Sequence, residues 1–118
     1  MLTGPKRAGM EVSFKNRSLR ALCEEPEAAT AQYGGDVARA LINRIADIAA
    51  AETIEDVLAG NPTISEAGKG ESVSILLGGG HRIILRCNHL NPPMSALGKV
   101  DWSKVSRVRV EGIEGCDA

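Results

Sequence analysis

The chain has 118 residues, of which 43% are hydrophobic and 25% are charged, and its formal net charge is −1. This length suits one domain with a single core, and the lack of an apolar run of about 18 residues argues against a membrane-spanning protein. The near-neutral charge does not by itself indicate a nucleic-acid-binding protein.

The N-terminal end differs in character from the rest of the chain. Residues 1–9 include Lys6 and Arg7 without an apolar segment behind them, which argues against a secretory signal. Three cysteines that are expected to be reduced thiols lead us to expect a cytoplasmic protein. We interpret residues 1–9 as a flexible extension or a vector-derived remnant that contributes little, and residues 10–118 as one domain. Glu11–Phe14 is a short strand candidate, and Phe14 is expected to fill the core beneath the helix that follows.

Two helices are predicted in the first half of the chain. Apolar residues three and four positions apart predict a short helix over Ser18–Cys23, and Pro26 ends it or starts the next turn. After a double-glycine break, Asp36 is a suitable N-cap for a long amphipathic helix. The apolar face of that helix consists of Val37, Leu41, Ile45 and Ile48.

The middle of the chain predicts a β-hairpin. Ser72–Leu77 and His81–Cys87 are apolar-rich runs joined by three glycines, a spacing typical of a tight hairpin. Because side chains alternate between the two faces of a strand, the aliphatic residues of each run share one face. The return strand presents Arg82 and Arg86 on the opposite face, on either side of Ile84.

The C-terminal part adds a further strand after a long excursion. Asn88–Lys99 contains two prolines and a glycine and is predicted to be an exposed loop. Trp102 is expected to anchor the entry to a strand over Val105–Val110. In this strand Val108 and Val110 alternate with Arg107 and Arg109.

Helices in the first half and strands mostly in the second half predict an α+β domain. We expect a small antiparallel sheet that is packed on one face by two N-terminal helices. Four arginines would then project from the helix-free face: Arg82, Arg86, Arg107 and Arg109. Arginines on an exposed sheet face also serve solubility and protect sheet edges, and the residues alone leave this alternative open.

No residue pattern points to a metal or a cofactor, and we expect neither. The three cysteines, Cys23, Cys87 and Cys116, are odd in number and lack Cys-x-x-Cys spacing, which predicts reduced thiols. Gly68-Lys69-Gly70 is too short and wrongly spaced for a phosphate-binding loop.

Several segments occur in an order that resembles a known family. They are Val12–Leu19, Tyr33-Gly34, Ala51–Val57, Ser72–Ile75, His81–Ile83 and Val100–Val105. Together they resemble the RelE/ParE superfamily of type II toxin–antitoxin toxins, specifically the HigB-like, plasmid maintenance killer branch. His81-Arg82-Ile83 stands where that family usually has Tyr-Arg-Leu.

The resemblance implies a small antiparallel sheet backed by two N-terminal helices. For active members it implies a metal-independent endoribonuclease, or mRNA interferase, that cuts messenger RNA in the ribosomal A site with the RNA 2′-hydroxyl as nucleophile. It also implies a cognate antitoxin, often a HigA-like helix-turn-helix protein, that neutralises the toxin. Such a reaction needs cations that stabilise charge developing on the phosphate, and a group that transfers protons.

The resemblance and the strand pattern together give the candidate site residues. Arg82 matches the family's motif arginine, and Arg86 is its neighbour on the same strand face. The terminal histidine of the relatives falls on Asp117, and His89 lies in a loop, so these two are the candidates for proton transfer. His81 points by alternation to the face opposite Arg82 and is expected to be a core or edge histidine. The candidate RNA-binding residues are Lys69, Lys104, Arg107 and Arg109.

Two other functions stay open. The absence of the terminal histidine and the near-neutral charge fit a catalytically weakened toxin-fold binding module, which engages its antitoxin and regulates the operon. A gyrase-directed toxin, as in the ParE branch, ranks lower because the matching segments resemble the HigB-like branch.

Overall fold

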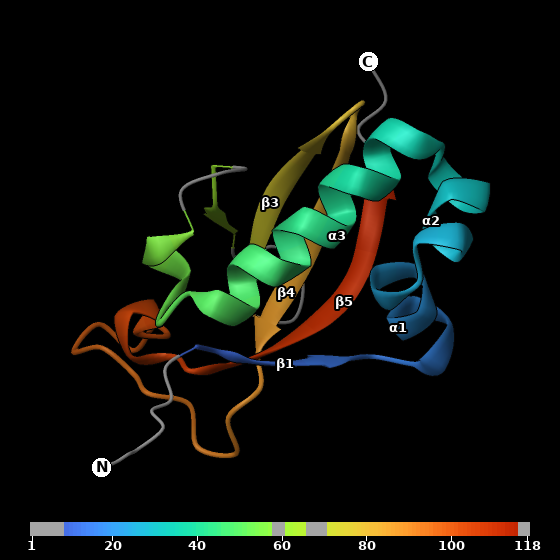
Figure 1. Ribbon diagram of the computed structural model, residues 1–118. Helices are drawn as coiled ribbons and strands as arrows, with labels where there is room; N and C mark the ends of the chain where they lie inside the picture. Colours follow the sequence, from blue (N-terminus) through green and yellow to red (C-terminus); the bar gives the residue numbers. More distant parts are fainter. Residues whose placement is uncertain (1–8, 58–60, 66–70, 116–118) are drawn as a thin grey trace, which may run out of the picture.

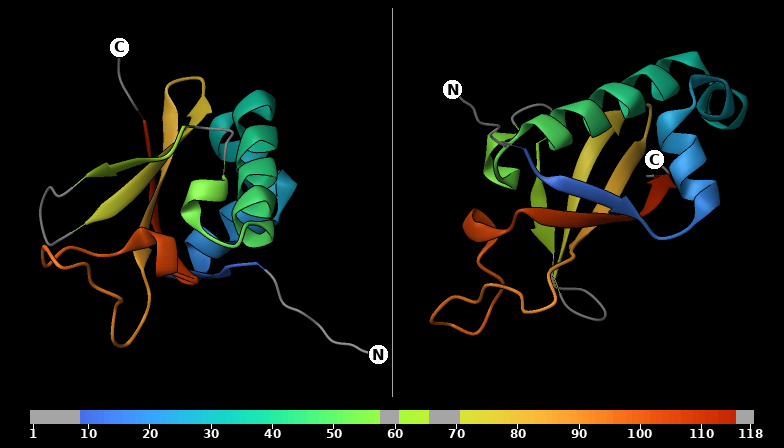
Figure 2. Two further views of the ribbon diagram at one scale, coloured as in Figure 1. Left: turned by 90° about the vertical axis from the view of Figure 1, so that its left-hand side faces the viewer. Right: turned by 60° about the horizontal axis from the view of Figure 1, so that its bottom comes forward.

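The computed structural model describes residues 9–57, 61–65 and 71–115. In this part of the chain, three α-helices lie on one face of a five-stranded sheet (Figure 1; Figure 2, left). The predicted α+β class, with helices on one face only, is therefore confirmed. The helices number three rather than two, and the sheet is mixed rather than purely antiparallel.

The three helices are α1 (Arg17–Glu24), α2 (Pro26–Tyr33) and α3 (Gly35–Ala50). Proline is well tolerated in the first turn of a helix, so Pro26 starts α2 directly after α1. The prediction missed α2 because Ala29 is its one buried residue, which leaves no apolar stripe to detect. The predicted cap of α3 is also wrong, because Gly34 is the N-cap and Asp36 lies in the first turn.

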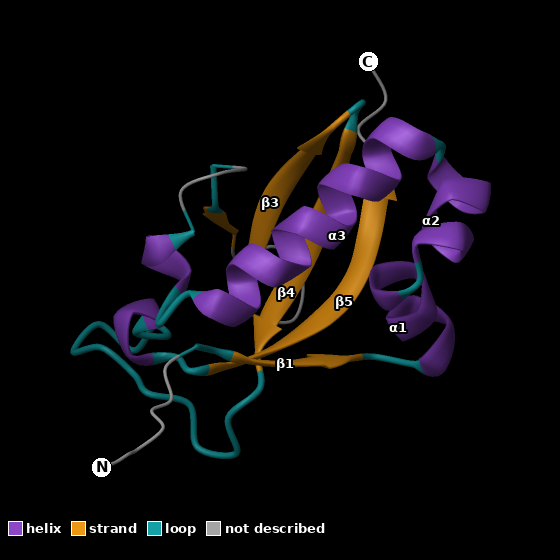
Figure 3. Cartoon of the chain, viewed as in Figure 1, coloured by secondary structure: helices purple, strands orange, loops and turns teal. Residues whose placement is uncertain are grey.

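The strands lie in the order β1-β5-β4-β3-β2. Their bounds are β1 (Glu11–Phe14), β2 (Thr63–Ser65), β3 (Ser72–Gly78), β4 (His81–Cys87) and β5 (Arg107–Gly115), as drawn in orange in Figure 3. The predicted hairpin is the antiparallel β3–β4 pair. β1 pairs in parallel with β5, a geometry that requires a long connection across the domain instead of a tight turn.

The hairpin turn requires its glycines. Gly78, Gly79 and Gly80 all have φ between +60° and +86°, a region that other residues rarely adopt. A Cβ added to Gly79 would lie 2.8 Å from Cγ2 of Val37, so the turn also packs closely against α3.

Replacing Gly79 with alanine is expected to lower the free energy of unfolding by about 1–3 kcal/mol, because both the positive φ and the close approach to Val37 penalise a side chain. Urea denaturation followed by circular dichroism measures the change. Gly112→Ala is the matched control, because a Cβ there has no neighbour within 4 Å. Equal stability losses in the two variants would contradict this account of the turn.

The core lies between the helices and the sheet. Most of its fully buried side chains come from α3, β3, β4 and β5, and they include Leu41, Ile48, Ile75, Ile83 and Leu85. Trp102 is 4% exposed in the short 3₁₀ helix η2 (Trp102–Lys104), which confirms its predicted anchoring role. The carboxylate of Glu71 accepts hydrogen bonds from Trp102 Nε1 at 3.0 Å and from the backbone N–H of Val100, and thereby fixes the end of the long excursion.

Near the N-terminus, Gly9 packs against the end of α3, since a Cβ there would lie 1.9 Å from the carbonyl oxygen of Ala49. Phe14 is only half-buried against the core, and the guanidinium of Arg20 lies 5.6 Å from its ring centroid. None of the described helices is long and apolar enough to cross a membrane.

Candidate functional site

The helix-free face of the sheet carries a hollow of about 380 Å³. It is lined by Lys15, Ser65, Ser72, Ser74, Arg82, Ile84, Arg86, Glu111 and Glu114. These side chains come from β2, β3, β4, β5 and the end of β1, so the hollow extends across the sheet. The described residues that line it include three cations and two carboxylates, which gives them a net charge of +1, together with three serines and one isoleucine.

Arg82 and Arg86 lie together in this hollow, on the helix-free face as predicted. They alternate along β4 with Ile83 and Leu85, which are fully buried beneath the helices. Ile84 lies between them on the same face. Four residues of strand place the two arginine Cα atoms about 13 Å apart, so each can contact a different group of an extended ligand.

A β-bulge shapes one wall of the hollow. Ile84 pairs with Gly112 and the next residue, Leu85, pairs with Val110, so Glu111 is an extra residue in β5. The shift returns Ile113 to the core side, where it packs against the buried cluster. It also brings Glu114 directly opposite Arg82 on the open face.

Carboxylates accompany the arginines of this sheet face. Nη2 of Arg82 lies 2.9 Å from Oε1 of Glu114, and Arg109 pairs with Glu111. At the first residue of β5, Nε of Arg107 lies 3.5 Å from Oε1 of Glu11. The face therefore consists of neutralised pairs around a hollow with a small excess of positive charge.

Lys15 and the two glutamates of the hollow were missed by the sequence interpretation. Lys15 reaches the hollow because its backbone N–H continues the β1–β5 ladder and donates to the carbonyl oxygen of Val110 at 3.0 Å. Alternation along β1 then puts Lys15 on the face of Ser13. Alternation along β1 could have predicted Lys15 as a residue of the hollow only if β1 had been placed beside β5. No signal in the sequence indicates that β1 and β5 pair.

The other predicted residues lie elsewhere. Nε2 of His89 accepts hydrogen bonds from the backbone N–H groups of Ser106 and Arg107, at 2.9 and 3.2 Å. His89 thus fixes the start of β5. It follows the last residue of β4, whereas Arg82 lies near the beginning of that strand. Lys104 lies in η2 with its Nζ 4.0 Å from Asp101. The structure does not bring His89 or Lys104 into the hollow.

The three remaining residues discussed from the sequence are His81, Asp117 and Lys69. His81 faces the helix side, where its ring makes an edge-to-face contact with Tyr33 at 5.1 Å between centroids, as expected for an edge histidine. Asp117 and Lys69 lie outside the described residues.

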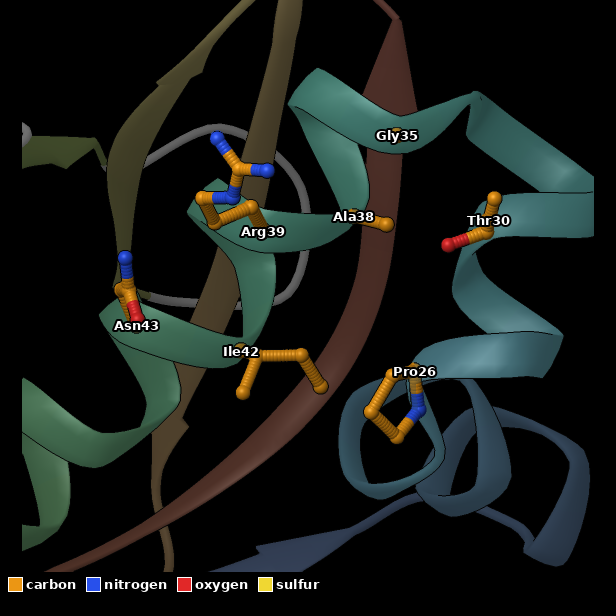
Figure 4. Close-up of a pocket in the computed structure, with 7 residues that line it drawn as sticks. All are labelled: Pro26, Thr30, Gly35, Ala38, Arg39, Ile42 and Asn43. Atoms are coloured by element: carbon orange, nitrogen blue, oxygen red, sulfur yellow. The ribbon is translucent and has the colours of Figure 1, made fainter.

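A second concave surface lies between α2 and α3, on the other side of the domain (Figure 4). This groove has a volume of about 320 Å³ and an apolar floor that includes Pro26, Ala38 and Ile42. Arg39 and Asn43 form one rim. Arg39 is exposed and, within the described part of the chain, makes no ion pair or hydrogen bond.

Cys23 is a buried thiol whose ionisation is perturbed by its surroundings. Its burial, and secondarily the charge of Glu24, raise the pKa of the thiol to about 12. Burial also raises the pKa of Tyr33, with a smaller contribution from Cys23. Since the thiolate is the reactive form, Cys23 is an inert part of the core and no nucleophile.

We expect Cys23 to resist alkylation by iodoacetamide in the folded protein, even when the pH is raised from about 7 to about 9, because the thiol stays protonated throughout this range. Cys87, which is only half-buried, is expected to react. Peptide mass spectrometry after labelling distinguishes the two sites, and denaturant provides the positive control for Cys23. Equal labelling rates in the folded protein would contradict the buried position of Cys23.

No cluster of three or more potential metal ligands occurs among the described residues. Comparisons of this chain with protein-family models, with curated proteins and with solved structures returned no match. The hollow itself offers guanidinium and ammonium groups for an anion, hydroxyl groups for hydrogen bonds and two carboxylates for proton transfer.

Proposed function

We propose that this protein is the toxin of a type II toxin–antitoxin system and that it cleaves messenger RNA on the ribosome with the hollow of its sheet. The observation that carries the proposal is the joint position of Arg82 and Arg86, with Lys15, in one hollow of the helix-free face. Guanidinium groups bind phosphate through paired hydrogen bonds and keep their charge at any physiological pH.

The chemistry we propose uses the RNA as its own nucleophile. The 2′-hydroxyl oxygen attacks the adjacent phosphorus, the bond to the 5′ oxygen breaks, and a 2′,3′-cyclic phosphate and a 5′-hydroxyl result. The arginines stabilise the negative charge that develops on the phosphate oxygens. A carboxylate takes the proton of the 2′-hydroxyl, and the leaving 5′ oxygen takes a proton from solvent water.

Within the hollow, Glu111 is the carboxylate to which we assign the proton transfer. Its side chain is only 16% exposed and is held by Arg109, so it has a fixed position beside Arg86 and Lys15. A fixed base within reach of the reacting hydroxyl contributes by orientation as well as by basicity.

Inducible expression of the chain without its neighbouring genes tests this function. Growth arrest with loss of full-length messenger RNA is the expected result, and primer extension on a reporter transcript locates the cuts. Normal growth with intact messenger RNA at high expression would overturn the proposal.

A second candidate function is a toxin-fold module that binds its antitoxin without cleaving RNA. The observation in its favour is that Arg82, Arg107 and Arg109 already have carboxylate partners, which weakens the attraction of this face for phosphate.

For either function we propose that an antitoxin segment occupies the groove between α2 and α3. The apolar floor suits aliphatic side chains, and Arg39 suits an acidic residue beside them.

Reversing the charge of Arg39 to glutamate is expected to weaken antitoxin binding at least about tenfold, because a rim cation that pairs with an acidic partner becomes repulsive. The partner for this experiment is the product of the adjacent open reading frame, and isothermal titration calorimetry measures the affinity. Arg17→Glu, on α1 outside the groove, carries the same charge change. Equal effects of the two variants would rule out the groove as the docking surface.

A further inference from the structure

Glu114 is a carboxylate partner of Arg82. Its Oε1 accepts hydrogen bonds from both Nη2 and Nε of Arg82, at 2.9 and 3.3 Å. The side chains are 39% and 54% exposed, so the pair lies at the surface of the hollow and can separate without unfolding the sheet.

The β-bulge is what creates this pair. In a regular ladder that continued from Leu85 and Val110, the residue opposite Arg82 would be Ile113 instead of Glu114. One extra residue thus replaces an aliphatic side chain with a carboxylate at the candidate catalytic arginine. The same shift keeps Ile113 in the core. The packing of Ile113 and the Arg82–Glu114 ion pair therefore depend on one feature of the backbone.

A carboxylate and a phosphate bind the same donors of a guanidinium group. The Nε and Nη2 groups that hold Glu114 are therefore among those that an RNA phosphate would use. In the RNA-free protein these donors are occupied, and the described residues that line the hollow carry a net charge of only +1.

We infer that Glu114 is an internal ligand of Arg82 that RNA must displace, and that it thereby sets the RNA affinity of the hollow. This inference rests on the proposed function, because it names how the same site is regulated. Exposed ion pairs are weak, so a ligand with several phosphates can open this one. Removing the carboxylate releases the Nε and Nη2 donors from Glu114 and takes away a charge that repels phosphate.

The experiment compares RNA binding by the full chain and by Glu114→Gln. The probe is a fluorescein-labelled single-stranded RNA whose 2′-hydroxyl groups are methylated, so that it is bound and not cut, and fluorescence anisotropy gives the dissociation constant at about 0.1 M salt. The matched control is Glu24→Gln. Glu24 pairs with Arg20 on α1 at 3.3 Å with similar exposure, away from the hollow, and loses the same charge.

We expect Glu114→Gln to bind the probe about fivefold more tightly than the unmodified chain, and Glu24→Gln to stay within about twofold of it. Binding by Glu114→Gln alone, with none by the unmodified chain, would support the inference as well. If the unmodified chain binds and Glu114→Gln gains no more than Glu24→Gln, the inference is overturned while the proposed function stands. If neither the unmodified chain nor Glu114→Gln binds, both are overturned.

Discussion

Replacing Arg82 with alanine is expected to lower the rate of RNA cleavage by about 100- to 1,000-fold, because one fixed donor to the developing phosphate charge is lost. Single-turnover cleavage of a defined RNA by purified protein measures this rate. Arg82→Lys is expected to recover only part of it, since an ammonium group keeps the charge but not the planar fork of the guanidinium.

Arg39→Ala is the control for this prediction. It removes the same charge from an exposed arginine of α3, on the helix side of the sheet, and is expected to leave the cleavage rate within about twofold of the unmodified protein. If Arg82→Ala cleaves RNA at the unmodified rate, the hollow is not the site of the reaction. If it leaves growth arrest unchanged and antitoxin binding intact, the binding-module function is favoured.

Replacing Leu85 with alanine is expected to lower the free energy of unfolding by about 2–5 kcal/mol, because the side chain is completely buried between β4 and the helices and its loss leaves a cavity. A loss of this size is a large part of the stability of a domain of this length. Chemical denaturation measures it directly. The same variant is expected to lose toxicity in cells through a lower amount of folded protein.

Leu97→Ala is the matched control, because the Leu97 side chain is 83% exposed and its removal is expected to change stability by less than about 0.5 kcal/mol. Both variants delete the same atoms from a leucine. If they lose equal stability, Leu85 is not in the core, and the assignment of the helix side and the open side of β4 would be wrong.

The sequence predicts the parts of this fold that depend on local periodicity. The apolar face of α3 recurs every three or four residues, and the glycine turn between two aliphatic runs defines the β3–β4 hairpin. Strict alternation along β4 then puts Arg82 and Arg86 on one face and Leu85 on the other. The central pair of the candidate site follows from this alternation alone.

The rest of the site depends on contacts between distant segments. Ser13 and Arg109 are neighbours in the parallel β1–β5 pair although 96 positions separate them in the chain, and no local pattern encodes such a pairing. Lys15 joins the hollow only through it. The bulge at Glu111 shifts the register of β5 and accompanies the packing of Ile113 against the core, so the partner of Arg82 could not be identified from alternation along β5.

The central claim is that RNA binds the open face of the sheet through Arg82 and Arg86, and a nuclear magnetic resonance titration tests it most directly. Adding the methylated single-stranded RNA to isotope-labelled protein is expected to shift the amide signals of β4 and of residues 111–114, and to leave those of the α2–α3 groove unchanged. Shifts confined to the α2–α3 groove, with none on β4, would contradict the claim.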